Sequence, residues 1–179
     1  RITSLLWGDD ELWIGCAERG GVELHNGIWR SDGAQVWHTP FTRSLAPYVE
    51  MVNDLHLGDN GHVWAATDAG AVRIVGVADY ELLSERDGIP VEKVTAVVEG
   101  PDGEFYFGND GGGLTIYDGV RMRTLTTQDG LAGDRVTSLE LTDDGQLWIG
   151  THSGVSRYDG EVLSSFTQAD GLPHPRVAD

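Results

Sequence analysis

A unit of about 42 residues recurs along this chain, and the recurrence limits the folds that the chain can adopt. The unit is easiest to follow at one aromatic residue, which returns at intervals of 51, 42 and 42 residues. An apolar stretch precedes the aromatic residue in each copy, and a glycine-containing loop follows it. The aromatic residues are Trp13, Trp64, Tyr106 and Trp148, so four copies are present. Self-similarity at a fixed period indicates a repeat architecture in which each unit packs on its neighbours.

Each copy contains four short segments that are typical of β-strands. The first segments read RITSLLW, MVNDLHL, KVTAVVE and RVTSLEL, and the aromatic segments read LWIGC, VWAAT, FYFGN and LWIGT. Such runs of β-branched, aliphatic and aromatic residues, separated by Asp-Gly and Asn-Gly turns, predict antiparallel hairpins. The first copy carries about nine extra residues, which explains its longer interval.

Four strands per repeat predict an all-β fold, a β-propeller of four blades with four antiparallel strands each. An up-and-down barrel or a sandwich also uses many short strands, but neither needs a recurring unit of four. The predicted blades are residues 1–49, 50–92, 93–134 and 135–176, and residues 177–179 align with the start of a further repeat. Four blades could close alone, but we expect these four to form part of a larger ring of seven or eight. An open row would expose two apolar faces, so we expect association with further blades or with a second copy of the chain.

The segment from Arg135 to Pro173, RVTSLELTDDGQLWIGTHSGVSRYDGEVLSSFTQADGLP, closely resembles the two-component regulator propeller repeat. The resemblance extends over the whole chain in four copies of differing quality. It implies a recognition module in the extracytoplasmic sensor region of a bacterial signalling protein, on the periplasmic or extracellular side of the membrane. It also implies a small molecule, a glycan or a protein as the ligand.

The charge of the chain narrows the classes of partner. There are 29 acidic and 12 basic residues, and the net charge of −17 would repel nucleic acid phosphates and anionic lipid surfaces. We therefore expect no nucleic acid partner and no direct membrane contact. The single cysteine, Cys16, cannot form an internal disulfide.

Loop positions that share one face of a propeller supply the candidate ligand-binding residues. Loops on a rigid scaffold are where binding groups can vary, and here one set of loops follows the aromatic strands while the other precedes the first strands. The candidates of the first set are Asp68, Asp110 and His152, and those of the second set are Glu92, Asp134 and His174. The alternative is that these residues are solvated and form local turns.

The aromatic residues of the repeat are expected to be structural. Trp13, Trp64, Tyr106 and Trp148 lie on second strands, which neighbouring blades enclose, so each large ring would fill a gap between blades. No metal site or cofactor is expected, because the acidic turns lack the spacing of calcium loops and the histidines lack zinc-ligand spacing.

Two functions are therefore considered. The leading hypothesis is a recognition propeller that is not an enzyme. The alternative is a metal-assisted lyase of the kind found among similar propellers, in which His152 would act as the general base and Asp110 and Asp68 would position a cation.

Overall fold

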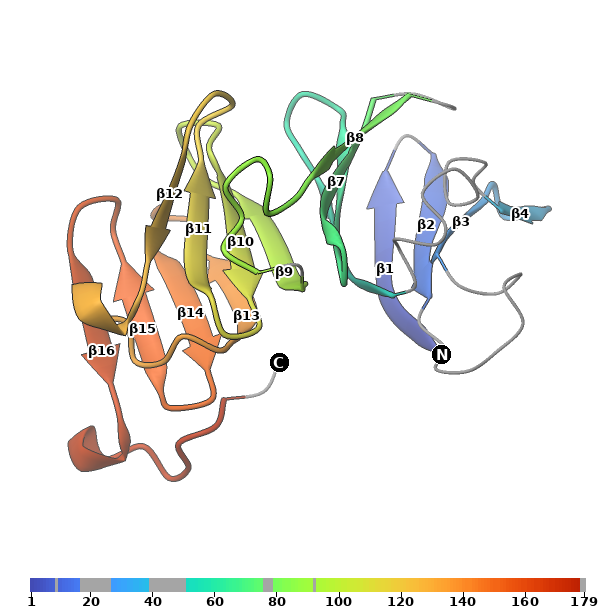
Figure 1. Ribbon diagram of the computed structural model, residues 1–179. Coiled ribbons are helices and arrows are strands. Elements are labelled where there is room, and N and C mark those ends of the chain that lie inside the picture. The colour runs from blue at the N-terminus through green and yellow to red at the C-terminus, as the bar shows by residue number, and fades with distance from the viewer. Residues whose placement is uncertain (9, 17–26, 39–50, 76–78, 92, 178–179) are drawn as a thin grey trace.

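The fold was analysed in a computed structural model of residues 1–179. The structure describes all residues except 9, 17–26, 39–50, 76–78, 92 and 178–179. The described residues form four antiparallel sheets, each of four strands that follow one another in sequence (Figure 1). The predicted all-β propeller fold is confirmed. Among the described residues, helix is limited to two single turns of 3-10 helix, Thr127–Asp129 and Gln168–Asp170.

The strands of each sheet pair in the order of the chain. The first sheet contains β1 (Ile2–Gly8), β2 (Glu11–Cys16), β3 (Gly27–Ser31) and β4 (Val36–His38). The second sheet contains β5 (Val52–Leu57), β6 (Val63–Thr67), β7 (Gly70–Ile74) and β8 (Tyr80–Leu83). The third sheet contains β9 (Val94–Glu99), β10 (Phe105–Asn109), β11 (Gly113–Tyr117) and β12 (Met122–Leu125). The fourth sheet contains β13 (Val136–Leu141), β14 (Leu147–Thr151), β15 (Val155–Tyr158) and β16 (Leu163–Phe166).

The first strands of neighbouring sheets lie next to one another, and the later strands of each sheet fan away from them (Figure 1). A β-bulge at the second residue of each first strand leaves that residue out of register with the second strand. A bulge re-aims the side chain of the extra residue, and here the side chain turns toward the next sheet. The bulged residues are Thr3, Asn53, Thr95 and Thr137.

Each bulged side chain donates a hydrogen bond to a backbone carbonyl of the next repeat. The acceptors are equivalent residues, one repeat apart. Thr3 Oγ1 donates to Val52 O at 2.5 Å, Asn53 Nδ2 to Val94 O at 2.7 Å, Thr95 Oγ1 to Val136 O at 3.1 Å and Thr137 Oγ1 to Val177 O at 2.8 Å. Neighbouring blades are therefore joined by one hydrogen bond that recurs with the repeat.

The core lies between sheets as well as within them. Three apolar clusters fill the three junctions, and each contains the aromatic residue of one blade together with strand residues of the next. Trp13, Trp64 and Tyr106 are 8%, 1% and 3% exposed, as expected of residues that fill these junctions. Trp148 lies on the outward side of the fourth sheet, where no further sheet covers it within the described residues, and it is only half-buried. There its ring stacks on Phe166, with the ring centroids 6.1 Å apart.

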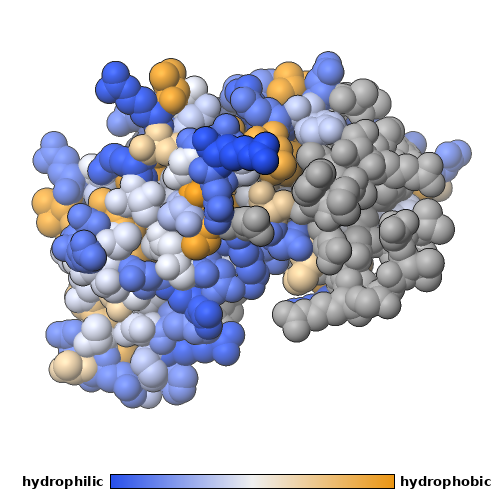
Figure 2. All heavy atoms as spheres, in the orientation of Figure 1, coloured by the Kyte–Doolittle hydropathy of each residue, from blue (hydrophilic) through white to orange (hydrophobic). Residues whose placement is uncertain are grey.

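Both outer sheets present apolar side chains. Leu5 and Trp7 on β1 are 61% and 64% exposed, whereas Leu55, which stands at the position of Leu5 in the second repeat, is 7% exposed. On the side shown in Figure 2, the described residues are largely hydrophilic, with scattered apolar spots.

An arginine covers the repeat aromatic residue in the first two blades. The Arg30 guanidinium lies 4.7 Å from the ring centroid of Trp13 and pairs with Glu11, and Arg73 lies 5.8 Å from Trp64 and pairs with Glu81. In both blades the arginine is on the third strand, directly opposite the tryptophan of the second strand. A cation over an indole face contributes about 0.5–1 kcal/mol of stability at an exposed site. These arginines are therefore part of the framework of the blade.

Candidate functional site

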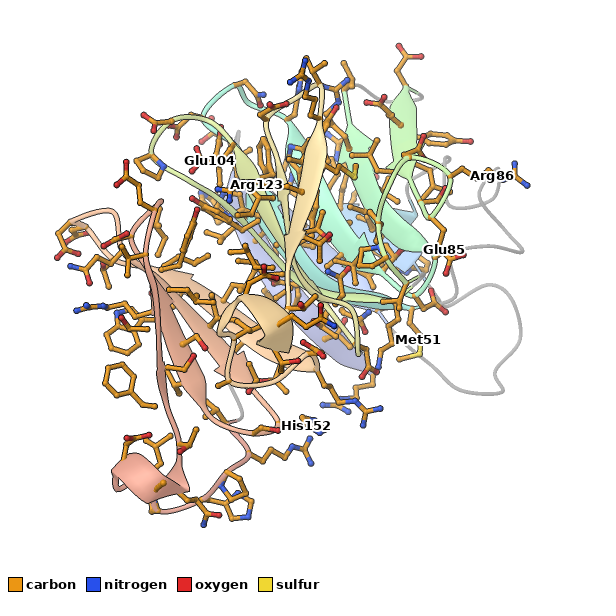
Figure 3. The ribbon with its side chains drawn as sticks, turned by 60° about the vertical axis from the view of Figure 1, so that its left-hand side comes forward. Met51, Glu85, Arg86, Glu104, Arg123 and His152 are labelled. Atoms are coloured by element: carbon orange, nitrogen blue, oxygen red, sulfur yellow. The ribbon has the colours of Figure 1, made fainter. Side chains whose placement is uncertain are left out.

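Three of the predicted site residues stand at equivalent places on one edge of the sheets. Each follows a second strand, and its backbone N–H donates to the carbonyl of the residue that precedes the first strand of the same blade. These bonds are Asp68 to Met51 at 3.2 Å, Asp110 to Lys93 at 3.1 Å and His152 to Arg135 at 3.0 Å. Figure 3 shows Met51 and His152 along this edge, at the opposite end of the sheets from Glu104 and Arg123.

Asp110 connects the third and fourth blades. Its Oδ2 lies 2.7 Å from Lys93 Nζ, and its Oδ1 lies 2.7 Å from Arg135 Nε. The hydrogen bond from Lys93 and the positive charges of Lys93 and Arg135 lower the pKa of the Asp110 carboxyl, so the group stays ionised. The carboxylate therefore bridges two cations that belong to successive blades.

His152 stands in the next blade at the position that Asp110 holds in the third. The side chain is half-buried. Partial burial and the positive charges of Arg176 and Arg135 lower the pKa of the imidazole, and the Asp110 carboxylate opposes them. The Val177 N–H donates to Thr151 O at 2.9 Å, which brings Arg176 close to His152.

Asp68 holds its own blade together at this edge. Its Oδ1 accepts a hydrogen bond from the Met51 N–H at 3.0 Å, while its own N–H donates to Met51 O. The two bonds join the start of the first strand to the end of the second strand. Asp68 thus lies along the same edge as Asp110 and His152, one blade earlier.

Asp134 and His174 face their own loops. The Asp134 carboxylate accepts from the backbone N–H and the hydroxyl of Thr127, at 2.7 Å and 3.1 Å, and its carbonyl accepts from Gly111 and Gly113. His174 is exposed, and its Nδ1 accepts the Arg176 N–H at 3.0 Å. Both residues shape the loops that carry the edge. Glu92 lies outside the described residues.

Four basic residues share one position of the repeat, immediately before the first apolar residue of a first strand. We call this set the basic row, and it consists of Arg1, Lys93, Arg135 and Arg176. Met51 stands at the same position in the second repeat. One third of the chain's 12 basic residues thus lie at one edge of a protein whose net charge is −17. The basic row is visible when the repeats are aligned, but acidic residues and histidines alone do not reveal it.

Potential metal ligands are not grouped in the described part of the chain. No group of three or more His, Cys, Asp or Glu side chains there is arranged to hold a metal ion. None of the helices in that part has the length and apolar character that crossing a membrane requires.

Comparison with known families finds one match. Residues 130–153 match the family described as "Two component regulator propeller". The segment runs from the loop before β13 through the aromatic strand β14 to Ser153, and it includes Arg135, Trp148 and His152. The resemblance to this repeat family, predicted from the sequence, is confirmed. A search of curated proteins finds no match to the chain.

Solved structures of β-propellers are similar to the whole chain. The extracellular domain of a hybrid two-component system from B. thetaiotaomicron is 17% identical, with a TM-score of 0.74 over 98% of this chain and 29% of that one. A catalytically inactive virginiamycin B lyase from Staphylococcus aureus, solved with quinupristin, is 17% identical, with a TM-score of 0.70 over 97% and 56% of the two chains. PorZ, a surface component of the type-IX secretion system of Porphyromonas gingivalis, is 17% identical, with a TM-score of 0.65 over 93% and 26%. This chain thus spans less than two thirds of each neighbour, and the likenesses establish the fold.

Proposed function

We propose that the chain is a recognition propeller that is not an enzyme and that belongs to the extracytoplasmic sensor region of a bacterial signalling protein. The observation that carries this proposal is the family match over residues 130–153. The similarity to the extracellular domain of a hybrid two-component system supports it at the level of the fold. A periplasmic or extracellular location is part of the same proposal.

The four blades would be consecutive members of a larger ring of seven or eight. Val177 supports this proposal, because it occupies the place that Val52, Val94 and Val136 occupy in earlier repeats. Its carbonyl accepts from the bulged Thr137, and a Cβ placed on Gly150 would lie 3.1 Å from its Cγ1. Exposed Leu5 and half-buried Trp148 stand where further blades would pack.

The ligand would bind at the edge that carries Asp68, Asp110 and His152. Side chains at this edge come from loops that successive blades hold in equivalent places, so a ligand could contact several blades at once. A small molecule, a glycan or a protein could engage such an edge. The bound ligand would pass its signal on by changing how the blades pack on neighbouring domains.

The alternative is a lyase that uses His152 as a general base. The similarity to virginiamycin B lyase favours it at the level of the fold. Its chemistry needs acidic side chains that can position a cation beside the imidazole. Lys93 and Arg135 already engage the Asp110 carboxylate, which counts against this role for Asp110.

One experiment separates the two functions. The chain would be screened by thermal shift against a panel of neutral and charged sugars and small organic acids, and mass spectrometry would follow each compound. The proposal predicts a compound that raises the melting temperature, is recovered unchanged and loses its effect with His152→Ala. A lyase would instead convert the compound into an elimination product. That product, lost with His152→Ala, would overturn the recognition proposal.

A further inference from the structure

Basic residues alternate with loop residues along the edge that carries the candidate site. From one blade to the next the order is Lys93, Asp110, Arg135, His152 and Arg176. Asp110 lies between the basic residue of its own blade and the basic residue of the next blade. The backbone brings His152 to the equivalent position, because its N–H donates to Arg135 O of its own blade and the Val177 N–H of the next repeat donates to Thr151 O.

The interval between Lys93 and Arg135 and the interval between Arg135 and Arg176 differ in the residue that lies between the two basic residues. Between Lys93 and Arg135, the Asp110 carboxylate contacts both cations at 2.7 Å. Between Arg135 and Arg176, the equivalent residue is His152, which brings no negative charge. Within the described residues, Arg176 forms no ion pair, and Arg135 pairs only with Asp110 through its Nε. The side chain of Arg135 is 55% exposed, so its outer face is accessible to solvent.

We propose that the interval between Arg135 and Arg176, over His152, binds a carboxylate group of a small-molecule ligand. The bound carboxylate would take the place that the Asp110 carboxylate holds one blade earlier, with one oxygen toward each arginine. A carboxylate suits the place because its two oxygens can each accept from a different cation, as those of Asp110 do. This inference deepens the proposed recognition function and rests on it.

The local charge supports the assignment. Lys93, Arg135 and Arg176 contribute three positive charges, and Asp110 removes one. The remaining charge favours an anion in a protein that is strongly negative elsewhere. Partial burial and the same cations lower the pKa of the His152 imidazole, and an anion bound over the ring would raise it again. Binding should therefore strengthen as the pH falls and the imidazole takes up its proton.

Isothermal titration of the full chain with benzoate and benzamide tests the proposal. The two probes have nearly the same shape and differ in charge. Because a hydrogen bond to a charged group is stronger than a neutral one, benzoate should bind about ten-fold or more tightly than benzamide. Benzoate binding should weaken at high salt. Equal affinities for the two probes would overturn the proposal, and so would binding of inorganic phosphate or sulfate without binding of benzoate.

A matched pair of variants locates the site. His152→Asp would supply an internal carboxylate between Arg135 and Arg176, as Asp110 does between Lys93 and Arg135, and should abolish benzoate binding. His152→Asn has the same shape without the charge and should weaken binding only a few-fold. Arg176→Gln should weaken binding at least ten-fold, and because Arg176 is exposed the variant should keep its melting temperature. Benzoate binding that His152→Asp leaves intact would refute the location.

The outcomes also keep this inference apart from the proposed function. If benzoate fails to bind but another compound raises the melting temperature through His152, recognition stands and the carboxylate assignment falls. If a compound is converted into an elimination product, the recognition proposal falls whatever the result with benzoate.

Discussion

The hydroxyl of Thr137 donates a hydrogen bond to the carbonyl oxygen of Val177, at 2.8 Å. The two residues stand one repeat apart, and the bond repeats the one from Thr95 to Val136 at 3.1 Å. In both cases the donor is the bulged residue of a first strand. The bulge thus converts a local irregularity of one sheet into a contact between sheets. Successive blades are coupled at the position where their first strands meet.

Loss of the hydrogen bond from Thr95 to Val136 should destabilise the junction between the third and fourth blades. Thr95→Val keeps the shape of the side chain but removes the donor, so Val136 O loses this partner, and so does Gly108 O, which lies 2.9 Å from the same hydroxyl. The free energy of unfolding should fall by about 1 kcal/mol. Thr95→Ser retains the hydroxyl and serves as the control. Urea denaturation of both variants measures the difference, and equal loss in the two would assign the effect to packing.

Close approach of blades explains the glycine of the aromatic strand. A Cβ on Gly108 would lie 2.6 Å from Val136 Cγ1 of the next blade, which is closer than carbon atoms can approach. Gly108→Ala should therefore lower the free energy of unfolding, by roughly 1–3 kcal/mol as overpacked cores do. The double variant Gly108→Ala, Val136→Ala removes the clashing methyl group. It should be less destabilised than the sum of the two single variants, and strict additivity would contradict this account.

The junction between the second and third blades should be sensitive to acid. His56 Nε2 accepts a hydrogen bond from the Glu99 N–H at 3.2 Å, which requires this nitrogen to be unprotonated. Burial lowers the pKa of the imidazole below its usual value of about 6.5. The unfolded chain then binds the proton more tightly than the folded chain. The stabilisation is complete above the unfolded pKa and is lost as the pH falls through that value toward the folded pKa.

His56→Gln tests this dependence, because the amide oxygen can accept from Glu99 without titrating. The loss of melting temperature between pH 7 and pH 5 should be smaller for His56→Gln than for the unchanged protein. His174→Gln, in an exposed loop, should change the loss less than His56→Gln does. If His56→Gln shows the full acid loss, the hydrogen bond to Glu99 does not govern the stability of this junction.

The repeat made the fold predictable, because strand spacing, turn residues and one recurring aromatic residue are all local features of the sequence. The burial of Trp13, Trp64 and Tyr106 followed from the same pattern. Trp148 differs, since the exposure of a ring at a junction depends on whether another blade covers it. Its local sequence is almost the same as that of Trp13 and contains no such information.

The candidate site was only partly predictable. Equivalence of the repeats predicted that Asp68, Asp110 and His152 share one face. The structure has them at equivalent places along one edge, and their binding role stays a prediction. The partners of Asp110 were not foreseen, because Lys93 and Arg135 come from two different blades and meet the carboxylate only in the folded chain. Loop residues such as Asp134 are also ambiguous in sequence, since a carboxylate that holds a turn and one that binds a ligand look alike.

The open faces of the outer blades support the central claim, that these four blades belong to a larger assembly. Leu5 and Trp7 are mostly exposed at one end, and Trp148 is half-buried at the other. The most direct test of this claim is light scattering on the chain as it elutes from a size-exclusion column, which gives its mass over a range of concentrations. The account predicts a mass above that of one chain that rises with concentration, and a smaller rise for Leu5→Gln, Trp7→Gln. A folded chain that keeps the mass of a monomer at every concentration would contradict it.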